Sequence, residues 1–285
     1  MKFGVSLFPL RAHQTVDVAT ACERLGYDSV WMGEHVVTPV HQDSHFPYAE
    51  DDAHQAFHGF LPFFDPYAAL GFLAARTSTL ELVVSISIVP LHDPFRLARS
   101  VMTMDQYSDG RFRFGIGSGW LREEFEIMGK PFNRRGRLLD ETLDVMDLLF
   151  TERVTTYRGD LLEVPPVAME PKPTTSPHPP YIFGGHGPKA LIRAATRGQG
   201  WLATGMSPET VGEATAFIRG KRAELARDDA FEFSAHITGD VTDAMVEAYG
   251  AAGIDRLVVR PWAKGSEAVD RLEELAERLA IRPDA

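Results

Sequence analysis

Cysteine is nearly absent from this sequence, because Cys22 is the only one in 285 residues. A single cysteine excludes a disulfide within the chain. Cys22 lies at helical spacing from Val18 and Leu25, so we expect it to pack in a core rather than to act as a nucleophile.

Long apolar segments are also lacking. The apolar run at residues 3–8 is ended by Pro9 and is too short for a signal peptide. No stretch approaches the roughly 20 apolar residues that a membrane-spanning helix needs. These absences predict a cytoplasmic protein without a membrane partner.

Basic residues are in deficit: 29 Lys and Arg stand against 40 Asp and Glu, which gives a net charge of -11. Such a charge repels nucleic acids and anionic membranes, so we expect neither as a partner. An anionic cofactor would need a local site of backbone N–H groups and a few basic side chains. With 44% apolar and 24% charged residues, the composition is typical of a globular protein.

Strands and helices alternate along the chain. Apolar runs predict strands at 3–8, 28–33, 82–89, 112–116, 181–184, 200–204, 231–238 and 255–260. Helix starts are indicated at Asp93-Pro94, Ser207-Pro208 and Ser266. The length allows two small domains or one barrel, but eight units whose strands are apolar on both faces favour closure. We therefore predict an α/β fold, a single (β/α)8 TIM barrel, as one domain over residues 1–285.

Two segments are longer than the connections that a minimal barrel requires. Residues 36–66 follow the second strand, are rich in His, Pro, Asp and aromatic residues, and lie at the barrel end where active sites form. A loop of this length is usually functional, so we expect it to cover a substrate. Residues 152–180 precede the fifth strand and begin with a hairpin-like stretch at 155–160. Both are predicted insertions.

Glycines follow the fourth and fifth strands. The run at 115–119 resembles part of a dinucleotide-binding motif, but Trp120 stands where that motif ends, which disfavours it. Either these small residues let a cofactor ring lie against the barrel mouth, or they form a tight turn only. The run at 184–187 precedes a helix expected near Pro188, and its backbone N–H groups favour a phosphate site over a flexible turn.

His35 ends the second strand. An imidazole, with an ordinary pKa of about 6.5, suits proton transfer at that position, although a structural role is the alternative. If strand alternation persists, Trp31 and His35 share one face and Glu34 points away.

Two further clusters are less specific. Four histidines suggest the hypothesis of a metal site: His41, His45, His54 and His58. No H-E-x-x-H pattern supports this hypothesis, so we expect no metal. The stretch Arg134-Arg135-Gly136-Arg137 could neutralise an anion or form a solvated helix start.

With these residues the sequence resembles the luciferase-like monooxygenase superfamily, and especially its branch of oxidoreductases that depend on the deazaflavin coenzyme F420. The similar stretches are residues 25–35, 65–66, 74–77, 90–94, 105–112, 117–120, 124–125, 129, 135–141, 180–185 and 200–201. Beyond about residue 205 the resemblance is weak. Trp120 departs from the acid that the sugar-phosphate dehydrogenases of this group carry there, which argues against that substrate class.

The resemblance implies a flavin-type ring at the carboxyl face of the barrel. It implies a non-proline cis peptide at Ser85-Ile86, in a bulge of the third strand that backs the ring. The residues assigned to the cofactor are Ser85, Ile86, Gly117, Gly119, Gly184, Gly185, His186 and Gly187. Catalysis is assigned to His35, and Trp120 and Glu34 are assigned to the substrate.

Three functions remain open at this stage. The first is an F420-dependent oxidoreductase that transfers a hydride between F420 and a small organic substrate. The second is a two-component monooxygenase that uses reduced FMN on the same scaffold, and the third is a flavin-binding barrel without catalysis. A homodimer is possible in each case, because relatives of this kind often dimerise.

Overall fold

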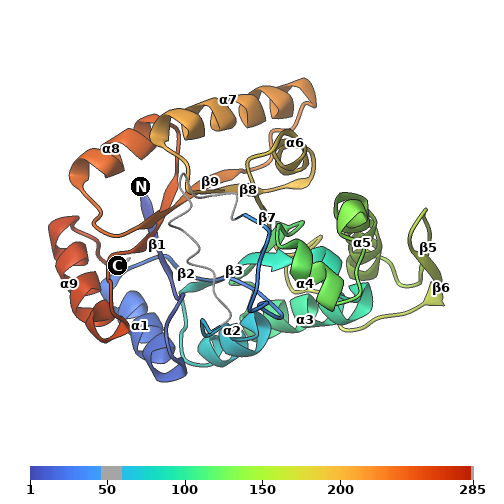
Figure 1. The fold of residues 1–285 in the computed structure, drawn as a ribbon, viewed down its shortest axis with the longest axis horizontal. Helices are drawn as coiled ribbons and strands as arrows, with labels where there is room; N and C mark the ends of the chain where they lie inside the picture. Colours follow the sequence, from blue (N-terminus) through green and yellow to red (C-terminus); the bar gives the residue numbers. More distant parts are fainter. Residues whose placement is uncertain (46–59, 284–285) are drawn as a thin grey trace.

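A computed structural model describes residues 1–45 and 60–283. Its strands close into a parallel barrel in the order β1-β10-β9-β8-β7-β4-β3-β2, and a separate antiparallel pair is formed by β5 and β6 (Figure 1). The strands are β1 (Lys2–Ser6), β2 (Ser29–Met32), β3 (Glu81–Ile88), β4 (Phe112–Gly117), β5 (Thr155–Arg158), β6 (Glu163–Val167), β7 (Tyr181–Gly184), β8 (Gly200–Thr204), β9 (Glu232–Thr238) and β10 (Arg256–Arg260). Each predicted strand overlaps one barrel strand, so the predicted (β/α)8 barrel is confirmed.

Helices surround the barrel (Figure 1). They are α1 (Ala12–Leu25), α2 (Pro66–Ala74), α3 (Pro94–Tyr107), α4 (Arg122–Ile127), α5 (Arg135–Thr151), α6 (Pro188–Arg197), α7 (Pro208–Glu224), α8 (Asp243–Ala251) and α9 (Ala268–Arg278). The side chains of Asp93 and Ser207 accept backbone N–H bonds at the starts of α3 and α7, as predicted. The prediction at Ser266 is wrong, because this residue lies in a 3-10 turn and Glu267 precedes α9.

The barrel interior is filled in layers. A central apolar layer consists of Trp31, Val83, Ile182, Leu202 and Val258. A larger core lies between the strands and the outer helices and includes Cys22, which is fully buried. Burial raises the pKa of the Cys22 thiol far above its ordinary value, which agrees with a packing role.

Charged residues close the amino end of the barrel. Arg256, the first residue of β10, has no exposed side-chain surface and contacts Glu81 at 2.6 Å and Glu232 at 3.1 Å. Its guanidinium also donates to Ser29 Oγ at 2.7 Å. The first residues of three strands are thus joined by one buried cation, and the opposite end of the barrel is left to form a pocket.

β3 is irregular near its carboxyl end. Its register against β4 shifts between Val84 and Ser87, and the Ser85–Ile86 peptide bond is cis, as the resemblance implies. A side chain at Gly115 could not be accommodated, because its Cβ would lie 1.8 Å from the carbonyl oxygen of Val84. The bulge in β3 therefore depends on a glycine in β4.

The predicted hairpin before the fifth barrel strand is confirmed. β5 and β6 pair antiparallel, and the hairpin projects outward beside α5 (Figure 1). The turn of the hairpin is held against α5, because the backbone N–H groups of Leu161 and Leu162 donate to the carboxylate of Glu141 at 2.8 and 2.9 Å.

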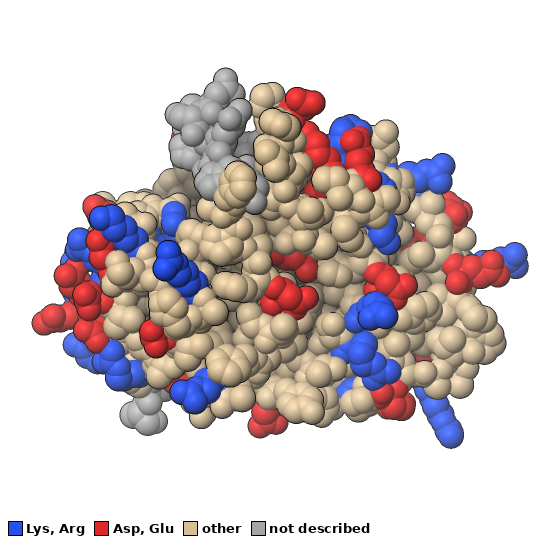
Figure 2. Space-filling model, turned by 60° about the horizontal axis from the view of Figure 1, so that its bottom comes forward, with Lys and Arg blue, Asp and Glu red and all other residues tan. Residues whose placement is uncertain are grey.

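Charges of both signs are interspersed on the face shown in Figure 2, mainly toward its edges. Within the described residues, no helix is both long and apolar enough to cross a membrane.

Candidate active site

A pocket of about 2080 Å³ opens at the carboxyl ends of the barrel strands. Its lining comes from the ends of β1, β3, β4, β7, β8, β9 and β10, from the residues after β2, and from the starts of α5 and α6. Every residue that the sequence analysis assigned to catalysis, cofactor or substrate lines this pocket. Their roles remain predictions, but the chain brings them to one cavity.

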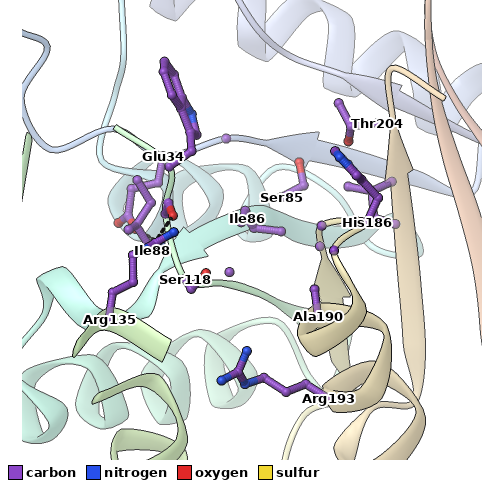
Figure 3. A pocket seen from close by; sticks show the side chains of 18 of the residues that line it. Glu34, Ser85, Ile86, Ile88, Ser118, Arg135, His186, Ala190, Arg193 and Thr204 are labelled. Atoms are coloured by element: carbon purple, nitrogen blue, oxygen red, sulfur yellow. Dashed lines mark hydrogen bonds between the residues drawn. The ribbon is translucent and has the colours of Figure 1, made fainter. Parts of the chain in front are cut away.

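Ile86 of the β3 bulge forms the floor on one side. In Figure 3 it lies between Glu34 and Ile88 on one side and His186 and Thr204 on the other. A Cβ at Gly117 would lie 1.6 Å from Ile86 Cδ1, and a Cβ at Gly184 would lie 2.9 Å from Ile86 Cγ2. These two glycines therefore leave room for Ile86. The contact gives a packing reason for glycine at 117, and its predicted role toward a cofactor ring remains a prediction.

Gly119 has a different reason to be glycine. Its φ is +75°, and a Cβ there would lie 2.7 Å from both Ile88 and Phe125. Arg135 Nε donates to the Gly119 carbonyl at 3.1 Å, and the Arg135 guanidinium stacks over Phe132. The loop after β4 is thus held in a fixed shape at the pocket edge.

The start of α6 faces the pocket. α6 begins at Pro188 after Gly187, which carries no side chain that could cap the helix. A Cβ at Gly187 would meet no described atom within 4 Å, so the space beside it is open. Gly185, with a φ of +100°, turns the chain here. This end of the pocket has the open backbone and the positive helix terminus that suit an anion.

Basic side chains surround this end. Arg193 is held by Asp140, at 2.6 and 2.8 Å, and serves to join α6 to α5. Arg134 and Lys189 also line the pocket, and neither side chain has an ion pair or hydrogen bond with any described residue. They give the pocket two positive charges, Lys189 in the first turn of α6 and Arg134 just before α5, although the protein as a whole is negatively charged.

His35 is held by a carboxylate that sequence analysis did not single out. Its Nδ1 lies 2.8 Å from Oε2 of Glu124, whose side chain is fully buried. The other oxygen of Glu124 accepts the backbone N–H groups of Val36 at 2.7 Å and Val37 at 3.3 Å. Trp120 meets the His35 ring edge to face, with ring centroids 6.2 Å apart. Because a carboxylate oxygen accepts hydrogen bonds, this contact favours the His35 tautomer that carries a proton on Nδ1.

Glu34 is engaged by the protein itself. Its carboxylate accepts bonds from Ile88 N at 2.7 Å and Ser87 Oγ at 2.9 Å, and it contacts His92 Nε2 at 2.9 Å. Burial raises the pKa of Glu34, but these partners outweigh burial and the net pKa lies below its usual value. Glu34 thus stays ionised and holds the residues that follow the bulge, while its predicted contact with a substrate remains a prediction.

The expected alternation of Trp31, Glu34 and His35 is wrong. β2 ends at Met32, and beyond it both Glu34 and His35 line the pocket. They nevertheless bind different partners, so the expectation that they act separately agrees with the structure.

The far wall of the pocket carries polar residues from β8, β9 and β10. Thr204 is paired in register with His236, and Arg260 ends β10. Burial first, and the charge of Arg260 second, lower the pKa of His236 to about 4. Sequence reasoning missed these residues, although polar side chains at the carboxyl ends of predicted barrel strands were a usable signal.

Residues 1–45 and 60–283 contain no group of three or more His, Cys, Asp or Glu side chains placed to hold a metal ion. His54 and His58, part of the metal hypothesis, lie outside the described residues.

Comparison with known proteins identifies the family. The family model described as luciferase-like monooxygenase matches residues 1–282. The chain belongs to the luciferase-like monooxygenase family. Members of this family are flavin- or F420-dependent oxidoreductases or monooxygenases, so this luciferase-like protein is an enzyme of that kind.

Individual relatives differ in their cofactor. The uncharacterized protein Rv0953c of Mycobacterium tuberculosis is 28% identical over 282 residues, covering 98% of this chain and 99% of the relative. The FMNH(2)-dependent dimethylsulfone monooxygenase of Pseudomonas putida is 27% identical over 225 residues, 72% of this chain and 61% of that protein. A solved F420-dependent secondary alcohol dehydrogenase superposes with a TM-score of 0.78 and 18% identity, covering 99% of each chain. The last likeness shows the fold alone.

Proposed function

We propose that this luciferase-like enzyme is an F420-dependent oxidoreductase acting on a small organic substrate. The observation that carries the proposal is the pocket that joins the Ile86 floor to the start of α6. The floor offers an apolar surface for a planar ring, and the helix start offers backbone donors for a phosphate. The residues present therefore fit a ring with an anionic tail.

Arg134 and Lys189 favour F420 over FMN. FMN ends in one phosphate, whereas the tail of F420 continues beyond its phosphate with carboxylates. Lys189, in the first turn of α6, and Arg134, just before α5, both line the pocket without side-chain partners in the described chain, and such a continuation could reach them. A tail with several charges can use both side chains as well as the helix terminus, whereas the helix terminus can hold a single phosphate without them.

When bound, the deazaflavin would supply hydride transfer. The chain's own residues would supply positioning and the proton. His35, oriented by Glu124, would accept or return the substrate proton through its imidazole. Trp120, packed against the His35 ring, would limit the space for substrate. Substrate held close to the ring gains the rate advantage of proximity.

An FMN-dependent monooxygenase is the second candidate, and the Pseudomonas putida relative is the observation in its favour. The pair of His35 and Glu124 argues against a barrel that binds flavin without catalysis, since storage requires no oriented base. We also propose that the enzyme is cytoplasmic and forms a homodimer.

The experiment is cofactor retention. The purified protein is incubated with F420 or with FMN, passed through a gel-filtration column, and read at about 420 nm for F420 and about 450 nm for FMN. We expect F420 to elute with the protein. Retention of FMN alone would move the assignment to the second candidate, and retention of neither would reject both.

A further inference from the structure

The wall of the pocket opposite Ile86 contains polar groups that the proposed cofactor contacts do not use. In the barrel order, β9 lies four places from β3, directly across the mouth. His236 of β9 and Arg260 of β10 both line the pocket there, with Thr204 beside His236 in register. The start of α6 follows β7, which neighbours β8 in the barrel, so Thr204 is the member of this wall nearest the proposed phosphate site, and His236 and Arg260 lie on strands further from β7.

His236 presents an unsatisfied nitrogen. Its Nε2 is buried and has no hydrogen-bond partner in the described part of the chain. Its pKa is lowered to about 4 by burial and then by Arg260, so the ring is neutral at physiological pH. Buried polar nitrogens in proteins are nearly always bonded, and one without a partner is costly unless a ligand supplies it.

Arg260 presents an unpaired cation. Its side chain makes no ion pair or hydrogen bond with any residue that the structure describes, and partial burial lowers the pKa of its guanidinium. Four residues earlier on the same strand, Arg256 is buried and bonds two glutamates. Two glutamates thus balance the charge of Arg256, whereas the charge of Arg260 faces the pocket.

We propose that Arg260, with His236 and Thr204, binds the carboxylate of an organic substrate. This inference rests on the proposed function, since it names the substrate class of the same pocket. A guanidinium donates two parallel bonds to a planar carboxylate, and that pairing cancels the charge of Arg260. The neutral imidazole and the Thr204 hydroxyl complete the contacts without adding charge.

The test uses cofactor-free protein and matched pairs of small probes at constant ionic strength. Acetate and benzoate are compared with acetamide and benzamide by calorimetric titration, and inorganic phosphate forms a separate arm. Arg260→Met removes the charge and keeps the length of the side chain, whereas Arg260→Lys keeps the charge. Arg271→Met is the control, because Arg271 is exposed on α9, where it pairs with Glu274.

We expect at least one carboxylate to bind wild-type protein and the Arg271 variant alike, with its amide partner failing to bind. Affinity should fall about tenfold or more in Arg260→Met and recover in part in Arg260→Lys. Any of three results would overturn the inference: carboxylate binding that does not depend on Arg260, equal affinity for the carboxylates and the amides, or binding of phosphate alone. Circular dichroism of each variant confirms the fold, so loss of binding is not loss of structure.

Failure of this inference can be told apart from failure of the proposed function. Carboxylate binding that depends on Arg260 supports the anion site even if neither F420 nor FMN is retained. Loss of F420 retention in Arg260→Met, together with unchanged carboxylate binding, would instead assign Arg260 to the cofactor and overturn the inference.

Discussion

Nδ1 of His35 lies 2.8 Å from Oε2 of Glu124, a carboxylate with no exposed surface. His35 follows β2 and Glu124 lies on α4, which follows β4; because β2 and β4 both pair with β3, the packing of these strands brings the two residues together. Because Glu124 also accepts two backbone N–H groups of the following loop, it positions both the imidazole and the chain that carries it. Glu124 is thus a positioning residue for His35.

Replacement of Glu124 by Gln should change the tautomer of His35. The amide oxygen can still accept the Val36 N–H, and the amide nitrogen then donates to Nδ1, which moves the ring proton to Nε2. Nitrogen NMR of histidine-labelled protein measures this directly, with His35→Asn to assign the signal. Glu123→Gln is the matched control, because Glu123 bonds the backbone of Asp43 and Ser44 instead. A wild-type ring already protonated on Nε2 alone would contradict the account.

Replacement of Gly117 by Ala should destabilise the protein. The added Cβ would lie 1.6 Å from Ile86 Cδ1, and overpacking of this kind typically costs about 1–3 kcal/mol of unfolding free energy. Truncation of Ile86 to Ala should restore much of that stability in the double variant, because it removes the atom in conflict. Urea unfolding of the four proteins measures the coupling. Simple additivity of the two substitutions would show that Ile86 is not what requires glycine at this position.

Replacement of Arg256 by Met should be among the most costly single changes. It leaves Glu81 and Glu232 without their buried cation, and loss of one partner from such a group costs about 3–5 kcal/mol. The exposed pair of Arg24 and Glu273 is the control, where Arg24→Met should cost about 1 kcal/mol or less. Equal losses in the two variants, measured by urea unfolding, would be inconsistent with a buried network.

Stability should fall as the pH is lowered from about 6.5 toward 5, in part because of His236. Its folded-state pKa is lowered to about 4 from an ordinary 6.5, so in this window the unfolded chain binds a proton that the folded protein excludes. Above the unfolded pKa the residue contributes no pH dependence. His236→Asn should therefore flatten the slope of unfolding free energy against pH in this window. An unchanged slope would mean that His236 titrates normally in the folded protein.

The barrel could be predicted from sequence because its signals are local. Apolar runs such as 82–89 and caps such as Asp93 are visible within a few residues. The glycines after β7 likewise marked the start of α6. Contacts between residues distant in sequence were not visible: Glu124 reaches His35 from 89 positions away.

The bulge in β3 also escapes the sequence pattern. Its residues read as one uninterrupted apolar strand, and only the family resemblance placed an irregularity at Ser85 and Ile86. The alternation expected after Trp31 failed for a related reason, since β2 ends before Glu34. Periodicity describes a strand only while the strand is regular.

A crystal structure of the protein with F420 tests the central claim most directly. The account predicts the deazaflavin ring in van der Waals contact with Ile86 and the phosphate at the start of α6, beside Gly187 and Lys189. A ring bound away from Ile86, or a phosphate held by Arg260 on the opposite wall, would contradict it.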